Sequence, residues 1–438
     1  MGPEIGAGAA PKGQARRSRG RGRAGPVPRS SSASQSHSLT QGLKSTPRHE
    51  KRTLNIICPK KAKHPIMKLT IERAALLKSL THVQSVVERR NTIPILSNVL
   101  IEAEGDALSL TATDMDLTVI DRIAATVSQP GATTAPAHTL YEIVRKLPEG
   151  AQVEIEAGGE NANLKLKAGR STFTLATLPR EDFPLTSGDD LPQAFPLQAA
   201  ELRTLIDRTR FAISTEETRY YLNGIYLHAA QSNSLPVLRA VATDGHRLAR
   251  VEMPLPDAAK DMPGVIVPRK TVTELRRLVD GIDDPVEIAL SDTKIRFAFA
   301  STVLTSKLID GTFPDYERVI PAGNDKVLEV DCKSFAEAVD RVSTISSEKS
   351  RAVKLAVDKG ALTLSANSPE NGTAVEELEI DYDGAGIEIG FNSRYLLDIT
   401  QQIEGDAAQF TMADAASPTI VREAADSSAL YVLMPMRV

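Results

Sequence analysis

The chain has 438 residues, of which 41% are hydrophobic and 4% aromatic, with no Trp and two Cys. This length accommodates about two to four domains of ordinary size, each able to bury its own core. Because Cys58 and Cys332 lie far apart, a disulfide framework and a Cys-x-x-Cys metal site are excluded, and we expect a reducing, cytoplasmic setting with no metal and no cofactor. No apolar run approaches the roughly 18 residues of a membrane span, so no membrane partner is expected.

The net charge of −4 conceals two regions of opposite sign. Residues 1–66 carry 14 Lys and Arg against two carboxylates, whereas residues 67–438 carry 38 Lys and Arg against 54 carboxylates. Residues 1–66 are also rich in Gly, Pro and Ser, and they cannot bury enough apolar surface to offset their ordering entropy, so we predict a disordered basic extension.

Three interpretations of this extension differ in function. A basic arm binds nucleic acid, an Arg- and Ser-rich, acid-poor segment is typical of a transit peptide, and a segment upstream of the native start has no function. The third is favoured because residues 67–72 begin with Met67 and are typical of an edge strand.

A short turn segment recurs along the chain. Its clearest copy is Ala-Thr-Asp-Gly-His-Arg-Leu at residues 242–248, with another copy at 112–117 and a looser one at 364–369, offset by 130 and about 123 residues. An amphipathic stretch that ends in Gly follows each copy, at residues 140–150, 271–281 and 395–405. Two independent markers in one register predict three tandem domains of the same fold.

Each repeat begins with an amphipathic helix, predicted at residues 73–87, 198–213 and 332–346 from apolar positions at three- and four-residue spacing. Alternating β-branched runs such as 108–113 and 361–366 follow, then the shorter helix, then a hairpin such as 153–156 with 163–167. The predicted fold class is α+β, with two helices packed on antiparallel sheet in each domain. Linkers rich in Pro, Gly and Asp near 184–194 and 321–326 give domains at 67–190, 191–324 and 325–438.

A catalytic interpretation rests on Asp244, His246 and Arg247, which could act in a DNA-directed hydrolase. The structural interpretation is stronger, because Asp-Gly is a turn former and the other two copies lack both His and Arg. No second catalytic cluster, phosphate loop or metal-protease motif occurs in residues 67–438, so we expect no catalytic residues and no enzyme.

Basic residues gather on the predicted helices, although residues 67–438 are acidic as a whole. Such a protein repels polyanions over most of its surface and offers them one favourable lining, which would hold duplex DNA without reading bases. A different interpretation is an architectural DNA binder that acts through the basic extension; it predicts that deletion of residues 1–66 abolishes DNA affinity.

Residues 67–438 resemble the bacterial DNA polymerase III beta subunit, the replicative sliding clamp. Seven stretches in one order carry the resemblance: 92–98, 219–224, 242–248, 267–270, 313–316, 390–395 and 431–438. The resemblance implies a noncatalytic, cytoplasmic clamp that tethers polymerase to duplex DNA and becomes associated with the nucleoid during replication. It also implies a homodimer of three-domain subunits that closes head to tail into a ring.

The resemblance carries over three sets of site residues. The implied dimer contact joins Phe173 and Leu175 of one subunit to Thr344 and Ile345 of the other. The implied DNA contacts are Arg90, Tyr220, Tyr221, Lys270, Asn392 and Tyr395. The implied pocket for short linear motifs of the replicative polymerase, the clamp loader, other polymerases and repair proteins comprises Leu222, Thr243, Gly245, His246, Arg247, Leu248, Pro314, Val319, Asn392, Tyr395, Val432, Met434, Pro435, Met436 and Arg437.

Overall fold

The structure is a computed structural model, and it describes residues 67–158, 163–185, 190–347 and 351–437. The prediction of disorder for residues 1–66 lies outside the described residues. Within the described ranges, no helix combines the length and apolar character needed to cross a membrane.

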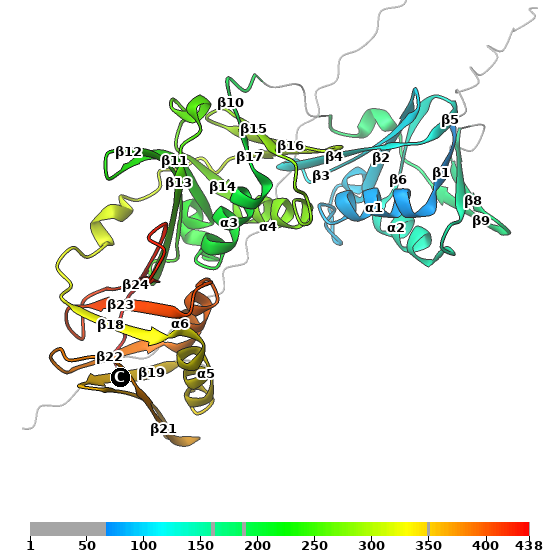
Figure 1. Cartoon of the computed structure of the whole chain (residues 1–438). Helices are drawn as coiled ribbons and strands as arrows, with labels where there is room; N and C mark the ends of the chain where they lie inside the picture. Colours follow the sequence, from blue (N-terminus) through cyan, green and yellow to red (C-terminus); the bar gives the residue numbers. More distant parts are fainter. Residues whose placement is uncertain (1–66, 159–162, 186–189, 348–350, 438) are drawn as a thin grey trace, which may run out of the picture. The chain divides into compact units, whose positions relative to one another are not determined.

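The first repeat alternates strands with two helices (Figure 1). Its elements are β1 (Met67–Glu72), α1 (Arg73–Gln84), β2 (Asn98–Glu104), β3 (Ala107–Thr113), β4 (Leu117–Ala124), β5 (Thr126–Gln129), β6 (Gly131–Pro136), α2 (Ala137–Lys146), β7 (Gln152–Ala157), β8 (Asn163–Ala168) and β9 (Ser171–Ala176). Short 3₁₀ helices η1 (Pro94–Ser97) and η2 (Arg180–Asp182) precede β2 and follow β9.

The second and third repeats follow the same order, without a counterpart of β5. The second contains β10 (Gln193–Leu197), α3 (Ala199–Arg210), η3 (Glu217–Leu222), β11 (Gly224–Ser232), β12 (Leu235–Thr243), β13 (Arg247–Pro254), η4 (Asp257–Ala259), β14 (Val265–Pro268), α4 (Arg269–Leu278), β15 (Val286–Leu290), β16 (Lys294–Phe299), β17 (Thr302–Lys307) and η5 (Tyr316–Val319). The third contains β18 (Lys326–Asp331), α5 (Cys332–Ser343), β19 (Ala352–Asp358), β20 (Ala361–Ser368), β21 (Gly372–Glu379), β22 (Ile387–Asn392), α6 (Ser393–Thr400), β23 (Ala407–Met412), β24 (Thr419–Glu423) and β25 (Ala429–Leu433). The predicted α+β class and the threefold repeat are confirmed.

The helix ends differ from the sequence prediction by a few residues. The first helix of each repeat ends three residues early, because the apolar pattern continues into a tight turn in which, for example, the Val86 N–H donates to the Val83 carbonyl at 3.3 Å. The second helices begin earlier than predicted: α2 and α4 start directly after Pro136 and Pro268, whose missing N–H costs nothing at a helix start.

Four antiparallel sheets carry the helices. Two sheets have eight strands and cross from one repeat to the next, in the orders β10-β15-β16-β17-β4-β3-β2-β6 and β14-β11-β12-β13-β25-β24-β23-β18. The other two, β5-β1-β7-β8-β9 and β21-β20-β19-β22, each belong to one repeat. The first helix of each repeat packs between its partner helix and the strands, as Leu76 and Leu80 of α1 do with no exposed surface.

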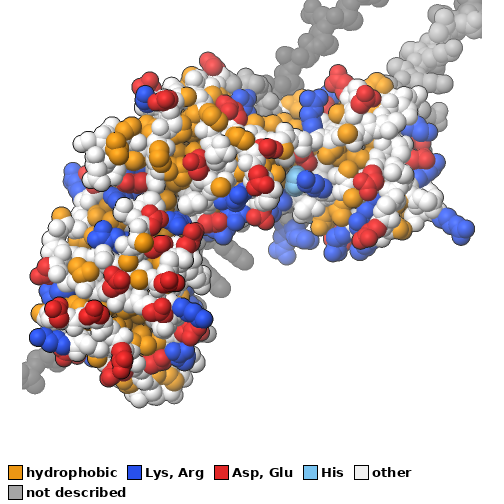
Figure 2. Space-filling model, viewed as in Figure 1, with side chains coloured by type: hydrophobic (Ala, Val, Ile, Leu, Met, Phe, Trp, Pro, Cys, Tyr) orange, Lys and Arg blue, Asp and Glu red, His pale blue; other side chains and the backbone are white. Residues whose placement is uncertain are grey.

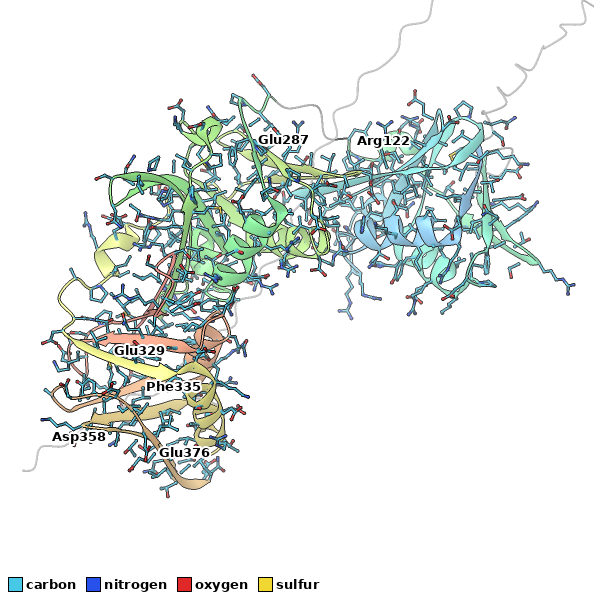
Figure 3. The ribbon with its side chains drawn as sticks, in the orientation of Figure 1. Arg122, Glu287, Glu329, Phe335, Asp358 and Glu376 are labelled. Atoms are coloured by element: carbon cyan, nitrogen blue, oxygen red, sulfur yellow. The ribbon has the colours of Figure 1, made fainter. Side chains whose placement is uncertain are left out.

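Aromatic and aliphatic side chains fill the core between helices and sheet. Phe335 of α5, labelled in Figure 3, is fully buried. Its ring centroid lies 5.1 Å from that of Phe410 on β23. Cys332, also on α5, is buried, and burial raises the pKa of its thiol. A reactive thiolate is therefore not favoured at this position.

Candidate functional site

The turn between β12 and β13 is fixed by its own side chains. The Thr243 hydroxyl donates to the Arg247 carbonyl at 2.7 Å and accepts from the Gly245 N–H at 3.1 Å. One oxygen of Asp244 accepts from the backbone N–H groups of His246 and Arg247 at 2.9 and 3.0 Å. Gly245 has φ +87°, a conformation that residues with side chains rarely adopt.

These contacts use Asp244 to hold the turn, and they give no support to the alternative interpretation of residues 244–247 as part of a hydrolase site. The second oxygen of Asp244 pairs with Arg247 at 3.1 Å, so the carboxylate does not orient His246 as a general base. Among the described residues, no group of three or more His, Cys, Asp or Glu could hold a metal ion.

Arg247 lies beneath the turn, not at its surface. Its guanidinium donates to Asp398 and to the Phe211 carbonyl at 2.5 Å, and it lies 4.3 Å from the centroid of the Tyr395 ring. Because Asp398 and Tyr395 belong to α6, this buried side chain connects the second repeat to the third.

The C-terminal strand lies directly beside this turn. On β13 and β25, Leu248 pairs with Val432 across the sheet, and the Met434 N–H donates to the His246 carbonyl at 2.9 Å. Residues about 180 positions apart in the sequence, such as 248 and 432, therefore share one surface. Neither half of this surface is complete without the other.

An apolar cluster lies under the paired strands. Leu222, Leu248 and Val432 are buried in it together with Phe313 and Tyr316. At its margin Val319 is 47% exposed and Met434 41% exposed, and Pro314 is also exposed. The face shown in Figure 2 likewise carries hydrophobic side chains over β11 and β13. Large exposed apolar side chains beside a buried apolar floor are typical of a docking surface.

The end of the chain continues from this surface toward the third repeat. After Pro435, the Met436 N–H donates to the Gly390 carbonyl of β22 at 2.8 Å, and Arg437 is exposed. Asn392, the last residue of β22, caps α6 by accepting from the Arg394 N–H at 3.0 Å. The residues carried over to the pocket thus lie on β12, β13, β25, η3, η5, β22 and α6, in the loops beside them and at the C-terminal end of the chain.

Two of the residues carried over to DNA binding share one open hollow of about 630 Å³. Tyr220 and Lys270 both line it, together with Asn223, Arg269 and Thr273. Tyr221 lies beside it, with its ring 5.8 Å from that of Tyr220 in an edge-on arrangement. Asn392 and Tyr395 belong to the third repeat and do not line this hollow.

Lys270 is not a free cation of the helix surface. Its ammonium group donates to Asp114 and, at 3.2 Å, to Glu88, both in the first repeat. Burial by itself lowers the pKa of Lys270, but hydrogen bonding to Asp114 and Glu88 outweighs burial, and the net pKa is raised. The side chain is charged and largely neutralised by its neighbours, whereas Arg90, beyond the end of α1, is exposed.

The residues carried over to the dimer contact lie at opposite ends of the repeat series. Phe173 and Leu175 are on β9, the last strand of its sheet, and both side chains are half-buried. Thr344 is the C-cap of α5, and the Ile345 carbonyl accepts from the Asn371 side chain at 3.3 Å beside the start of β21. β21 is also the last strand of its sheet.

Some residues of these surfaces were not expected from the sequence. Arg269 lines the same hollow as Lys270, and its position next to Lys270 in a basic run was an available signal. Phe211 and Asp398 hold Arg247, but no local pattern connects them, since they lie 36 and 151 residues from it.

Three tandem repeats of one sheet-and-helix unit, joined through their sheets, define a DNA-clamp type of protein. Family models of the DNA polymerase III beta subunit match residues 67–187 (N-terminal domain), 196–315 (central domain) and 317–437 (C-terminal domain). The chain is 59% identical over 372 residues to the beta sliding clamp of Caulobacter vibrioides and 41% identical over 374 residues to that of Escherichia coli; each match covers 85% of this chain and 100% of the relative.

Solved structures give the same result. A beta sliding clamp structure from C. crescentus superimposes with a TM-score of 0.84 at 59% identity, covering 86% of this chain and 100% of that chain. A DnaN sliding clamp from Bartonella birtlesii has a TM-score of 0.83 at 50% identity, covering 85% and 100%. The chain belongs to the DNA polymerase III beta subunit family of sliding clamps, whose role in DNA replication is that of a noncatalytic processivity factor.

Proposed function

We propose that two copies of this chain close head to tail into a ring around duplex DNA and hold DNA polymerase on its template. The observation that carries this proposal is the pairing of sheets between repeats. The fourth strand of one repeat pairs with the last strand of the next, as β4 with β17 and β13 with β25. Two strands have no partner of this kind within the chain: β21, the fourth strand of the third repeat, and β9, the last strand of the first repeat. Each is the edge strand of its sheet among the described residues.

Open sheet edges are usually protected from pairing with other chains. Here the side chain of Val375 on β21 is 70% exposed, and Phe173 and Leu175 on β9 are half-buried. We propose that β21 of one copy pairs with β9 of another. β21 is the equivalent of β4 and β13, and β9 is the equivalent of β17 and β25, and these strands pair within the chain as β4 with β17 and β13 with β25. A contact between two different surfaces closes only when the rotation is right, and two copies of three repeats give a ring of six.

The repeats also indicate the register of this contact. Phe173, Leu304 and Tyr431 are equivalent, since each pairs with the matching residue of the preceding strand. Leu304 pairs with Val119, and Tyr431 pairs with Ala249. The residue of β21 equivalent to Val119 and Ala249 is Ala374, as judged from its pairing with Ala366. We therefore propose that Phe173 pairs with Ala374 of the partner subunit.

A second contact follows from the same equivalence. The α3 C-cap residue Phe211 lies 5.7 Å from Tyr431, ring to ring. The equivalent C-cap of α5 is Thr344, and the equivalent of Tyr431 is Phe173. Thr344 and the adjacent Ile345 would thus cover Phe173 and Leu175 of the other subunit.

The charge distribution supports the proposal that the ring encloses duplex DNA. Lys and Arg side chains gather over α4 in Figure 2, whereas residues 67–438 are acidic as a whole. Phosphate contacts of this kind hold duplex DNA without reading its bases and weaken with salt. We propose that these contacts come from Arg90, Tyr220, Tyr221, Lys270, Asn392 and Tyr395.

The apolar surface around Leu248, Val432 and Met434 is proposed as the docking site for short linear motifs. The related B. birtlesii clamp was solved with griselimycin bound, and a C. crescentus clamp with polyethylene glycol bound at a region proposed for beta-motif tethering. Proposed partners are the replicative polymerase, the clamp loader, other polymerases and repair proteins. The clamp acts on DNA in the cell interior, and we propose cytoplasmic residence with association to the nucleoid during replication.

We retain 67–190, 191–324 and 325–438 as the proposed domain boundaries. Each range holds one complete series of strands and helices, from β1 to β9, from β10 to η5 and from β18 to β25.

Cross-linking tests the register. In a variant whose native cysteines are replaced (Cys58→Ser and Cys332→Ala), Thr174→Cys with Thr373→Cys introduces a pair that the register sets directly opposite across the two chains. Opposite residues lie about 4.5–5.5 Å apart between Cα atoms, within disulfide reach. We expect oxidation to convert most of the protein into covalent dimers on a non-reducing gel.

The matched control combines Thr174→Cys with Glu377→Cys. Glu377 is four residues farther along β21, a displacement of about 13 Å, so no cross-link is expected. Equal cross-linking of both pairs, or of neither, would contradict the proposed register.

A further inference from the structure

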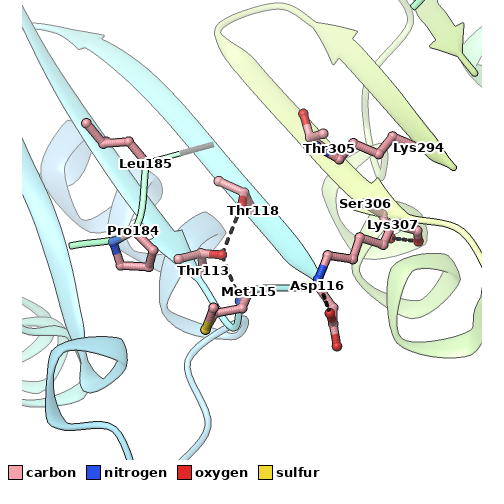
Figure 4. Close-up of a pocket in the computed structure, with 10 residues that line it drawn as sticks. All are labelled: Thr113, Met115, Asp116, Thr118, Pro184, Leu185, Lys294, Thr305, Ser306 and Lys307. Carbon is pink, nitrogen blue, oxygen red and sulfur yellow. Dashed lines mark hydrogen bonds and ion pairs between the residues drawn. The ribbon is translucent and has the colours of Figure 1, made fainter. Parts of the chain in front are cut away.

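A second hollow lies between the first and second repeats, away from the surface proposed for polymerase motifs. Its volume is about 240 Å³, smaller than the pockets of drug-sized ligands. Figure 4 shows its lining from both repeats: Thr113, Met115, Asp116, Thr118, Pro184 and Leu185 on one side, and Lys294, Thr305, Ser306 and Lys307 on the other.

The turn at this hollow repeats the hydrogen bonds of the turn at residues 243–247. The Thr113 hydroxyl donates to the Leu117 carbonyl at 3.0 Å and accepts from the Met115 N–H at 3.0 Å. Asp114 accepts from the N–H groups of Asp116 and Leu117 at 2.9 and 2.7 Å. The two turns are therefore built in the same way.

The neighbouring strands correspond as well. The Lys307 N–H donates to the Asp116 carbonyl at 2.8 Å, as the Met434 N–H does to the His246 carbonyl at 2.9 Å. Pro184 follows the buried Phe183, as Pro314 follows the buried Phe313. The hollow is thus the counterpart, one repeat earlier, of the proposed motif-docking surface.

One residue of this turn adopts a costly conformation. Met115 has φ +78° at the position of Gly245, where residues other than Gly, Asn and Asp are uncommon. Its side chain is nevertheless 52% exposed, and the nearby Leu185 is 64% exposed. Strained residues of this kind concentrate at binding sites, where they present a side chain to a ligand.

The chemistry of the lining differs from that of the other surface. Thr118 and Thr305 replace Leu248 and Val432 in the floor, and Lys307 replaces Met434 at the edge. Lys307 pairs with Asp116 at 3.0 Å, but both groups are more than half exposed, and such surface pairs contribute little and exchange readily. Two lysines beside two exposed apolar side chains suit a carboxylate next to an apolar residue.

We propose that this hollow is a second peptide-docking site, selective for an extended segment that carries Asp or Glu beside an aliphatic residue. The apolar residue would lie between Met115 and Leu185, and the carboxylate would bind Lys294 and Lys307. The inference rests on the proposed function, because the docking role is carried over from the counterpart surface.

Methyl NMR of the full-length chain, labelled with ¹³C at its methionine methyl groups, separates the two sites. Met115 reports on this hollow, and Met434 reports on the motif-docking surface. Titration with acetyl-Asp-Leu-Asp-Leu-amide is expected to shift the Met115 signal in both the native chain and the Met434→Ala variant. Acetyl-Lys-Leu-Lys-Leu-amide is the charge-reversed control and is expected to leave Met115 unchanged.

Two variants test the assigned contacts. Lys294→Glu with Lys307→Glu should weaken the Met115 response about tenfold, whereas Lys359→Glu, at an exposed turn of the third repeat, should leave it unchanged. Leu185→Ala keeps all charges and should also weaken it. An unshifted Met115 signal, or equal shifts with both peptides, would overturn the inference. The proposed motif-docking role is tested separately, by titration with a peptide from the polymerase. An unshifted Met434 signal in that titration would contradict the motif-docking role without bearing on the Met115 result.

Discussion

Arg247 connects two repeats through one buried guanidinium. It donates to Asp244, Asp398 and the Phe211 carbonyl, and it packs on the ring of Tyr395. A residue in this environment cannot leave its site to contact a ligand without breaking several contacts. We infer that Arg247 supports the proposed docking surface from below, while His246 and Met434 are exposed.

Replacing Arg247 by Ala leaves the carboxylates of Asp244 and Asp398 without their partner in a largely buried site. We expect the free energy of unfolding in urea to fall by about 2–4 kcal/mol. The control is Arg318→Ala, which removes an exposed pair with Asp315 and should change stability by no more than about 0.5 kcal/mol. Equal effects of the two variants would show that Arg247 is not a structural connector.

Arg90 and Lys270 are expected to differ in their contributions to DNA binding. Arg90 is exposed, whereas the charge of Lys270 is offset by Asp114 and Glu88. Arg90→Ala should therefore reduce the slope of log affinity against log salt on linear duplex DNA by about 0.9, the value of one phosphate contact. Lys270→Ala should reduce it less. An unchanged slope in Arg90→Ala would remove Arg90 from the DNA-binding surface.

At the scale of elements, the sequence specified the local structure well and the pairings between repeats poorly. The spacing of apolar residues such as Leu76, Leu80 and Val83 predicted α1, because a buried helix face has that period. The turns at Asp114 and Asp244 were recognisable because the same short segment recurs there and because Asp-Gly is a turn former. By contrast, the pairing of β13 with β25 depends on contacts between residues more than 170 positions apart, which no local pattern encodes.

The candidate site was likewise predictable from the sequence in its local parts and not in its contacts between repeats. Gly245 and His246 were found from the turn, but the convergence of Val432, Met434 and Leu222 around them came only from the family resemblance. The burial of Arg247 could not be predicted, since its carboxylate partner Asp398 lies in another repeat.

Met434 and the residues after it should bind partners without being required for the fold, whereas the β25 residues before them are buried in the sheet. Met434 is 41% exposed, and residues 436–438 follow the last strand. Met434→Ala combined with deletion of residues 436–438 should weaken a fluorescent peptide from the polymerase by about 1–3 kcal/mol in an anisotropy titration. Val327→Ala, at an exposed apolar position on β18, should bind the peptide normally. Dissociation of the truncated protein into monomers would contradict this assignment.

At the scale of the whole molecule, the same repeat serves three purposes. Its sheets join one repeat to the next, its helices carry cations, and its boundaries between repeats form the surfaces proposed for peptide docking. An acidic body with basic helices favours weak, screened contacts with phosphate, which allow movement along the duplex. We therefore expect retention on DNA to come from closure of the proposed ring, not from affinity.

The most direct test compares retention on circular and linear DNA. Labelled clamp is placed on a nicked circular plasmid by its clamp loader and ATP, isolated with the plasmid by gel filtration, and filtered again after the plasmid is cut once. Encirclement predicts that the clamp stays with the intact circle at a salt concentration that abolishes binding to fragments, and that it is lost after the cut. Equal loss from the circle and the linear form would contradict the ring.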